Sequence, residues 1–263
     1  MSRKPANPAE STSARRDEGM SPDTTTRAAI LGAARELFES AGYNRTTVEQ
    51  IRVLAGVSRA SFYFYFADKK AVFLEVLDEL SSDIEFLRET FAGPGNDEFA
   101  RIVLDLVGFF AMWARYTNTF RDGFAITISD PDAQQLMRGM RMRRYSMLNE
   151  RHVDGLTEST STFPAPLRHL APMLVLSLAT NFVVRFFAEP DVFNRSNTEF
   201  EDAVLAVSEA WYRIIFGCAA PCTVSREVIT KHRSTVDAIL DEKEAARLAT
   251  LRPSHGRNRR GRA

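Results

Sequence analysis

The sequence predicts an all-α protein in which a small N-terminal unit of three helices is joined through a fourth helix to a larger helical bundle. Two observations predict this class. Apolar residues recur at helical spacing along most of the chain, and no segment keeps the strict apolar–polar alternation of a half-buried strand. Gly, Pro, Asn and Ser stand between the apolar stripes, where helix ends are expected.

The composition is that of an ordinary globular protein. The 263 residues are 44% hydrophobic and 26% charged, which is enough to build a core, and the formal net charge is zero. The charge is unevenly spread, because residues 44–70 carry a net +3 and residues 252–263 carry +5. Two small basic segments are therefore attached to an acidic body, so any nucleic-acid contact must be local.

Cysteine content and hydropathy point to the cytoplasm. Cys218 and Cys222 are too few for a disulfide framework, and their spacing makes a poor zinc site, so no metal or cofactor is expected. Residues 1–20 lack the apolar stretch of a secretory signal. The most apolar run, residues 173–184, contains polar residues and is shorter than the ~20 residues that span a bilayer.

The first helix follows a polar leader. Residues 1–22 are rich in Ser, Pro and charge, and we expect them to form a disordered extension. Asp23 or Thr24 can cap the helix, an apolar stripe runs through Ile30 and Phe38, and Gly42 supplies the stop.

Two short helices and a long one follow. Thr46 and Glu49 have the spacing of a capping box that opens the second helix, and Gly56 ends that helix. Ser58 can cap a third helix. The fourth is expected over residues 69–91, before a Gly-Pro-Gly-Asn linker at residues 93–96.

Short helices joined by a tight glycine-containing turn form a helix-turn-helix, whose second helix enters the major groove by its N-terminal residues. With Ser58 as the cap, Phe62 and Phe66 face the core, while Arg59 and Tyr63 lie on the opposite side. Phe64 is expected at the edge of the interface or half-covered by the fourth helix. An arginine at this place can donate two hydrogen bonds to a guanine. The predicted DNA contacts are Thr47, Arg59, Ala60, Ser61, Tyr63, Tyr65 and Lys69.

At these residues the sequence resembles the TetR family of bacterial transcriptional regulators, over residues 27–77. The resemblance rests on Thr46-Thr47-Val48, on the turn Ala55-Gly56-Val57-Ser58, and on Phe62-Tyr63-Phe64-Tyr65-Phe66 followed by Asp68-Lys69. The aromatic run is similar to the branch that contains the ethionamide-resistance repressor of mycobacteria. Arg52 departs from the pattern, because the family usually has a small residue there; it either tilts the two helices or lies outward as an extra phosphate contact.

The resemblance implies a homodimer formed by the last two helices of the bundle. The sequence predicts that both helices are apolar on more than one face. An internal core is the alternative for the same residues. The predicted dimer contacts are Leu174, Leu178, Val204, Val207, Trp211 and Ile215.

Family members bind small effectors within this bundle, and the middle helices here carry many aromatic and Met side chains. Such a stripe is also typical of an ordinary core, but Met suits a pocket that repacks around varied apolar ligands. We expect an elongated apolar effector with one polar group near Asn181. The predicted ligand contacts are Phe109, Met112, Trp113, Tyr116, Phe124, Met142, Tyr145, Asn181, Phe182 and Arg185.

The expected domains are a helix-turn-helix domain over residues 23–72, an effector and dimerisation domain over 73–217, an extra C-terminal helix within 218–252 and a basic disordered tail over 253–263. The extra helix either pads the dimer or covers the pocket. The tail either adds phosphate affinity that does not depend on sequence, or only solubilises the chain.

These features predict a DNA-binding regulator. The resemblance implies that it is a repressor that binds a palindromic operator as a dimer and is released by a small apolar effector. One alternative is a DNA-binding dimer without an effector. The other is a helical enzyme acting on an apolar substrate, but no set of acid, base and nucleophile can be assembled from the sequence.

Overall fold

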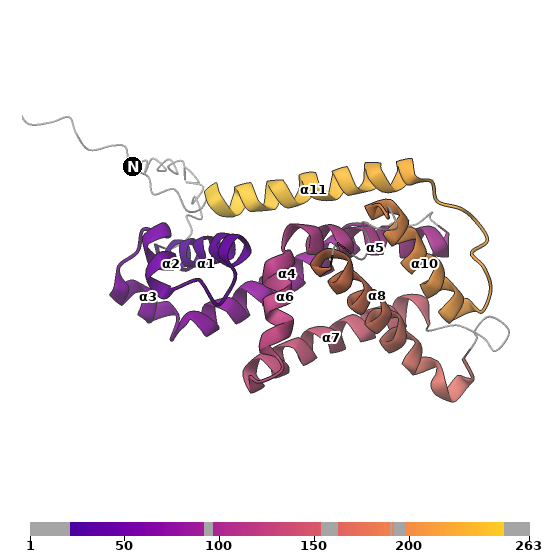
Figure 1. Cartoon of the computed structure of the whole chain (residues 1–263), viewed down its shortest axis with the longest axis horizontal. Helices are drawn as coiled ribbons and strands as arrows, with labels where there is room; N and C mark the ends of the chain where they lie inside the picture. Colours follow the sequence, from indigo (N-terminus) through magenta and orange to yellow (C-terminus); the bar gives the residue numbers. More distant parts are fainter. Residues whose placement is uncertain (1–21, 92–96, 154–162, 190, 192–197, 250–263) are drawn as a thin grey trace, which may run out of the picture.

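Every regular element of the described residues is a helix, so the predicted all-α class is confirmed (Figure 1). The computed structural model describes residues 22–91, 97–153, 163–189, 191 and 198–249. The helices are α1 (Pro22–Ala41), α2 (Val48–Leu54), α3 (Arg59–Tyr65), α4 (Lys69–Thr90), α5 (Glu98–Arg115), α6 (Thr117–Ile126), α7 (Pro131–His152), the 3₁₀ helix η1 (Ala165–Leu170), α8 (Ala171–Ala188), α10 (Phe200–Phe216) and α11 (Arg226–Ala249).

Helix α1 begins at Pro22, one residue before the predicted caps. The predicted disordered extension, apart from Pro22, lies outside the described residues, as do the Gly-Pro-Gly-Asn linker and the arginine-rich tail.

A small aromatic core holds the first three helices together. Phe38 of α1 and Phe62 of α3 are fully buried, and Phe66 is nearly so. Phe73 of α4 meets the Phe38 ring edge-on, with 5.0 Å between ring centroids. The predicted inward direction of Phe62 and Phe66 is therefore confirmed, and the start of α4 belongs to the same core.

The turns between these helices are set by local sequence, with one correction to the prediction. The capping box of α2 is formed by Thr47 and Gln50, not by Thr46 and Glu49. Thr46 is instead buried, and its hydroxyl donates to the carbonyls of Leu37 and Gly42. Because that hydroxyl already bonds backward along the chain, the next residue is the one free to cap α2.

Gly56 and Ser58 shape the turn as predicted. Gly56 has φ +67°, a conformation that costs side-chain-bearing residues energy, so glycine suits the turn between α2 and α3. The Ser58 side chain accepts a hydrogen bond from the Ser61 N–H at the start of α3.

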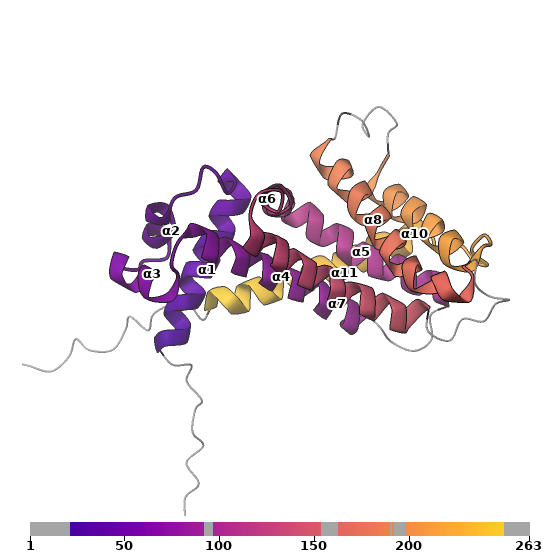
Figure 2. The same cartoon turned by 90° about the horizontal axis from the view of Figure 1, so that it is seen from below.

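Helix α4 leads from this N-terminal domain into the bundle, where α5 lies at the centre and contacts α4, α8, α10 and α11 (Figure 2). At the end of the molecule away from α3, α8 and α10 pack on each other.

Residues 165–188 form two consecutive helices. The chain forms the 3₁₀ helix η1 before α8 begins at Ala171. Pro172, which lacks an N–H, sits in the first turn of α8, where no intrahelical donor is needed. An 18-residue window within residues 165–188 has a mean hydropathy of 1.7, so this segment is long and apolar enough for a membrane span by length and composition. One such helix is weak support for a span, because the buried side of α8 packs against α5, α7 and α10.

Helix α11 lies along the bundle over α5 and reaches α1 (Figure 1). Ile229, Val236 and Leu240 are buried beneath it. Near its C-terminal end, Lys243 and Arg247 pair with the buried carboxylate of Asp83 on α4 at 2.8 and 2.9 Å. Because Arg35 of α1 pairs with Glu244 of α11 at 3.9 Å, the extra helix also ties the first domain to the body.

Candidate functional site

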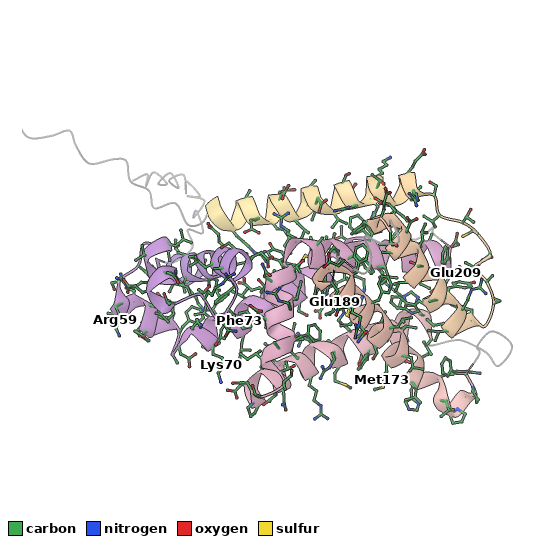
Figure 3. All side chains as sticks on the ribbon, viewed as in Figure 1. Arg59, Lys70, Phe73, Met173, Glu189 and Glu209 are labelled. Atoms are coloured by element: carbon green, nitrogen blue, oxygen red, sulfur yellow. The ribbon has the colours of Figure 1, made fainter. Side chains whose placement is uncertain are left out.

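One face of α3 is presented to solvent at the far end of the N-terminal domain. Arg59 and Ala60 are exposed at the start of the helix, and Tyr63 keeps 46% of its surface accessible. The Arg59 guanidinium lies 5.7 Å from the centre of the Tyr63 ring, and Figure 3 shows Arg59 projecting away from the rest of the molecule. This places a cation and a phenol side by side on the surface of the predicted reader helix.

The remaining aromatic residues of α3 divide by exposure. Phe64 is 76% exposed, so the expectation that α4 half-covers it is wrong. Its ring meets the Tyr65 ring edge-on at 5.0 Å, while Tyr65 is partly buried. The Ser61 hydroxyl lies 2.8 Å from that of Ser58 at the cap. An exposed Phe next to the reader face is an apolar group available for contact with DNA.

The ammonium of Lys69, a predicted DNA contact, is bonded to the protein's own backbone. Its ammonium donates to the carbonyls of Tyr43 and Thr46, at 2.7 and 2.9 Å, and lies 4.2 Å from the centre of the Tyr43 ring. Burial lowers the pKa of Lys69. Its first role in this structure is to fix the loop between α1 and α2, where the side chain of Thr47 is exposed.

Arg52, the departure from the family pattern, is held by its neighbours. It forms a salt bridge with Glu49 one turn earlier and donates to the Val57 carbonyl at 3.5 Å. Of the two roles left open, an outward phosphate contact would require this pair to open.

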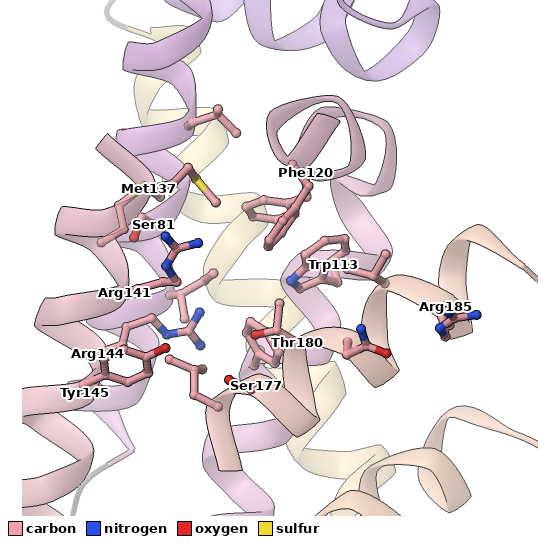
Figure 4. A pocket seen from close by; sticks show the side chains of 18 of the residues that line it. Ser81, Trp113, Phe120, Met137, Arg141, Arg144, Tyr145, Ser177, Thr180 and Arg185 are labelled. Atoms are coloured by element: carbon pink, nitrogen blue, oxygen red, sulfur yellow. The ribbon is translucent and has the colours of Figure 1, made fainter. Parts of the chain in front are cut away.

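A cavity of about 430 Å³ lies within the bundle, a size that suits a small-molecule ligand (Figure 4). Helices α4, α5, α6, α7 and α8 line it, and none of its lining residues comes from α11, so the extra helix does not cover this cavity. The lining residues are Leu77, Ser81, Ile84, Phe109, Trp113, Phe120, Phe124, Met137, Met140, Arg141, Arg144, Tyr145, Leu176, Ser177, Thr180, Asn181, Val184, Arg185 and Glu189.

The structure brings six of the predicted ligand contacts together in this lining: Phe109, Trp113, Phe124, Tyr145, Asn181 and Arg185. Four others do not line it. Met112 is fully buried in the core, and Met142 is 53% exposed. The Tyr116 hydroxyl donates to Glu244 at 2.7 Å, and Phe182 stacks on Phe186. Helical spacing identified the apolar helices, but it did not show which side of each helix faces the cavity.

Two cations of the cavity were missed by the sequence reading. Arg141 and Arg144 lie on α7, and Figure 4 shows both guanidinium groups directed from α7 toward the ring-lined side. Arg144 lies 4.4 Å from the centre of the Phe109 ring. The sequence signal was weak, because α7 carries several arginines and most of them are exposed, so none stood out as internal.

Helix α6 joins the cavity to the N-terminal domain. Phe120 and Phe124 line the cavity from α6. On the same helix, the Asp122 carboxylate accepts the backbone N–H of Tyr43 at 2.7 Å, just after α1. A Cβ on Gly123 would lie 2.9 Å from the Leu77 side chain of α4, so α4 and α6 are packed as closely as side chains allow.

The predicted dimer contacts on α10 need correction. Val204, Val207, Trp211 and Ile215 are at most 3% exposed within the single chain, so they belong to its own core and cannot meet a partner. The α8 residues differ, because Leu174 and Leu178 are 49% and 37% exposed. Met173 beside them also faces outward (Figure 3). Among the predicted dimer contacts, exposed apolar side chains are therefore found on α8.

A family model matches the N-terminal domain, whereas solved structures match the fold of most of the chain. A family model described as "Bacterial regulatory proteins, tetR family" matches residues 30–76, which span most of α1, all of α2 and α3, and the start of α4. The HTH-type transcriptional regulator EthR of Mycolicibacterium smegmatis is 31% identical over 115 residues, which cover 43% of this chain and 52% of that protein. The HTH-type transcriptional regulator RutR of Escherichia coli is 35% identical over 83 residues, or 30% of this chain and 39% of that protein. The chain thus aligns with about half or less of the length of these relatives.

Solved structures match the fold over most of this chain. A crystal structure described as that of a TetR-family transcriptional regulator from Syntrophomonas wolfei superposes with a TM-score of 0.58 at 16% identity, over 73% of this chain and 95% of that one. Its similarity concerns the fold and extends from the N-terminal domain into the bundle.

Proposed function

We propose that this chain, whose residues 30–76 match the TetR family of bacterial regulatory proteins, is a transcriptional repressor of that family that a small effector releases from DNA. In this proposal it acts in the cytoplasm as a homodimer and binds a palindromic operator through α3. The effector occupies the cavity of the bundle and lowers the affinity for the operator.

The exposed face of α3 carries the proposal. Arg59, Ala60 and Tyr63 stand free at the N-terminal end of this helix, while Phe62 on its other side anchors it in the core. A rigid helix that presents an arginine at this end is what the major groove accepts. Thr47 and Ser61 supply hydroxyls for phosphate contacts that position the domain.

We expect a dimer because the DNA-binding helix α3 is short. One short helix contacts few base pairs, so two copies on half-sites about 34–36 Å apart, or a multiple of that spacing, are needed for specificity. The exposed apolar side chains of Met173, Leu174 and Leu178 on α8 are the surface we propose for dimerisation.

The effector response follows from helices that serve both sites. Leu77 and Ser81 line the cavity from α4, and α4 begins beside the reader helix. Lys70 at that beginning pairs with Asp130 and Asp132 at the start of α7, at 2.9 and 2.8 Å. A ligand that pushes α4, α6 or α7 therefore moves the reader, and a coupling of ~1–3 kcal/mol would lower operator affinity about 5- to 150-fold.

Selection from a pool of random duplexes, followed by fluorescence anisotropy, tests the DNA-binding part. We expect wild type to select a palindrome, and Arg59→Ala to weaken binding to it by about 5- to 150-fold, from ~1–3 kcal/mol for a bidentate base contact. Arg138→Ala removes the same charge from an exposed site on α7 and is the matched control. No selected sequence, or equal losses in both variants, would refute the assignment of α3 as the reader.

A second measurement tests release. Candidate effectors are titrated into the protein–operator complex. Specific binding that no cavity ligand weakens would identify a DNA-binding dimer without an effector.

A further inference from the structure

Arg144 is a cation inside the cavity without an acid beside it. It lies on α7, and its guanidinium projects among the lining side chains (Figure 4). Among the described residues, no carboxylate forms a salt bridge with it, and its Nε is buried without a hydrogen-bond partner. An unpaired buried cation is costly, so its retention in an apolar cavity needs a reason.

The nearest acids are already engaged elsewhere. Glu85 pairs with Arg143 at 3.4 Å on the outer side of α7. Asp105 pairs with Arg151 at 3.0 Å and with Arg88 at 3.6 Å. These carboxylates act on Arg144 only through space. Neither is available to neutralise it.

The other charges of the cavity do not compensate. Glu189 is the one acid among the lining residues, and it pairs with Arg185 at 3.3 Å on the same helix. Arg141 adds a second guanidinium on α7, one turn before Arg144. The cavity wall therefore has an excess of positive charge on its α7 side.

The surroundings of Arg144 are those of a desolvated cation. The residue as a whole is only partly buried, but protein atoms surround its guanidinium closely, and burial lowers the pKa of Arg144 to about 9. The Phe109 ring at 4.4 Å stabilises the charge but accepts no conventional N–H hydrogen bond at the buried Nε.

We propose that the cavity binds a monoanionic amphiphile, a carboxylic acid with an elongated apolar body, whose carboxylate pairs with Arg144. The inference rests on the proposed function, since it names the chemical class of the effector. A carboxylate matches the planar fork of a guanidinium with two parallel hydrogen bonds. It also supplies the missing negative charge.

The rest of the cavity fits the apolar body. Trp113 stacks on Phe120 at 4.8 Å between ring centroids, and Phe124 lies 5.7 Å from Trp113. The Trp113 and Phe120 rings face the α7 arginines across the cavity (Figure 4). The arrangement puts the acid at α7 and the apolar body against α5 and α6. A phosphate carries up to two charges. Beyond Arg144 it would meet one further arginine on α7, because Arg185 is already paired with Glu189, so the second charge would be poorly matched.

Isothermal titration calorimetry on the full chain tests this. The probes are straight-chain carboxylic acids from octanoic to tetradecanoic acid and biphenyl-4-carboxylic acid, each beside its primary alcohol and below its aggregation concentration. We expect the best acid to bind at least tenfold more tightly than its alcohol. Arg144→Gln should weaken the acid roughly 10- to 150-fold, as for a hydrogen bond to a charged group, and leave the alcohol within about twofold.

Two further variants make the result specific. Arg138→Gln removes an exposed charge from the same helix and should bind acid and alcohol like wild type. Arg144→Lys keeps a cation without the fork and should fall between wild type and Arg144→Gln. It also serves in place of Arg144→Gln if that variant does not show the wild-type melting transition. No saturable binding by any acid, or an acid affinity unchanged in both Arg144 variants, would overturn the proposal.

The operator assay separates this inference from the proposed function. If an acid binds through Arg144 but leaves operator affinity unchanged, the assignment of the binding site stands and the effector role is refuted. If the alcohols release DNA as readily as the acids do, the effector role of the cavity stands and the assignment of a carboxylate ligand is refuted.

Discussion

Glu39, near the end of α1, holds Thr119 at the start of α6: its carboxylate accepts the backbone N–H of Thr119 at 3.1 Å and the hydroxyl at 3.0 Å. The same carboxylate accepts the N–H of Asn118 at 3.1 Å. A negative charge at a helix N-terminus satisfies free N–H groups and meets the positive end of the helix dipole. Because Phe120 is the next residue and lines the cavity, this contact joins the N-terminal domain to the wall of the cavity.

Glu39→Ala should therefore loosen the junction between the domains. We expect the free energy of unfolding to fall by about 0.5–2 kcal/mol, the usual cost of losing a helix cap, and the effect of an effector on operator affinity to shrink. Urea unfolding and anisotropy with and without the effector measure the two quantities. Glu36→Ala, at an exposed position on the same helix, should change neither; an unchanged coupling in Glu39→Ala would show that α6 is not the connection.

The aromatic run of α3 provides a matched pair for stability. Phe62 is fully buried and Phe64 is 76% exposed, two residues away. Phe62→Ala should lower the free energy of unfolding by about 3–5 kcal/mol, because it leaves a cavity in a small core. Phe64→Ala should change it by less than ~0.5 kcal/mol. Comparable losses in denaturant unfolding for the two variants would contradict the packing described here.

The proposed dimer can be tested on α8. A charge at Leu174 or Leu178 would be buried without a partner in the interface, so Leu174→Glu and Leu178→Glu should give monomers in sedimentation velocity experiments. Ile128→Glu, at a position that is 83% exposed on the loop after α6, is the control and should leave the dimer intact. Dimeric Leu178→Glu would place the interface elsewhere.

His152 should make stability depend on pH. It is buried, with Nε2 3.8 Å from the Asp105 carboxylate and Nδ1 against Glu98. Burial disfavours the imidazolium, but the two carboxylates outweigh burial and raise the pKa of His152 above its usual 6.5. Its contribution is therefore fully present below about pH 6.5 and is lost as the pH rises through the folded-state pKa.

Urea unfolding between pH 6 and pH 9 measures this contribution. Wild type should lose more stability over the interval than His152→Gln, which cannot titrate. The variant also corrects for the other groups that titrate there. Parallel profiles for the two proteins would mean that folding does not shift the pKa of His152.

The reader domain was predictable because its signals are local. Ser58 caps α3 through a residue three positions away, and Gly56 turns the chain by its own backbone angle. The spacing of Phe62 and Phe66 is one helical turn, so their shared face follows from the sequence. The error at Thr46 was also one of local detail, since a hydrogen bond back to Leu37 moved the cap by one residue.

The bundle was predictable only as a set of helices. A helix that is apolar on several sides has more than one face to bury, and its period does not say which neighbour covers each face. Met112 and Trp113 are adjacent and both buried, yet only Trp113 borders the cavity. Trp211 was placed at a dimer interface from the same kind of stripe, and it lies in the core of its own chain.

By itself, then, the sequence determined the all-α class, the helix-turn-helix and the exposed arginine of its reader helix, because these depend on residues within a few turns of one another. Only the tertiary structure decided that Arg144 meets Phe109 beside a cavity, that Glu39 caps α6 and that α11 ties α4 to the C-terminus. Those contacts join residues far apart in the chain. They depend on how whole helices pack, which hydrophobic spacing along one helix does not specify.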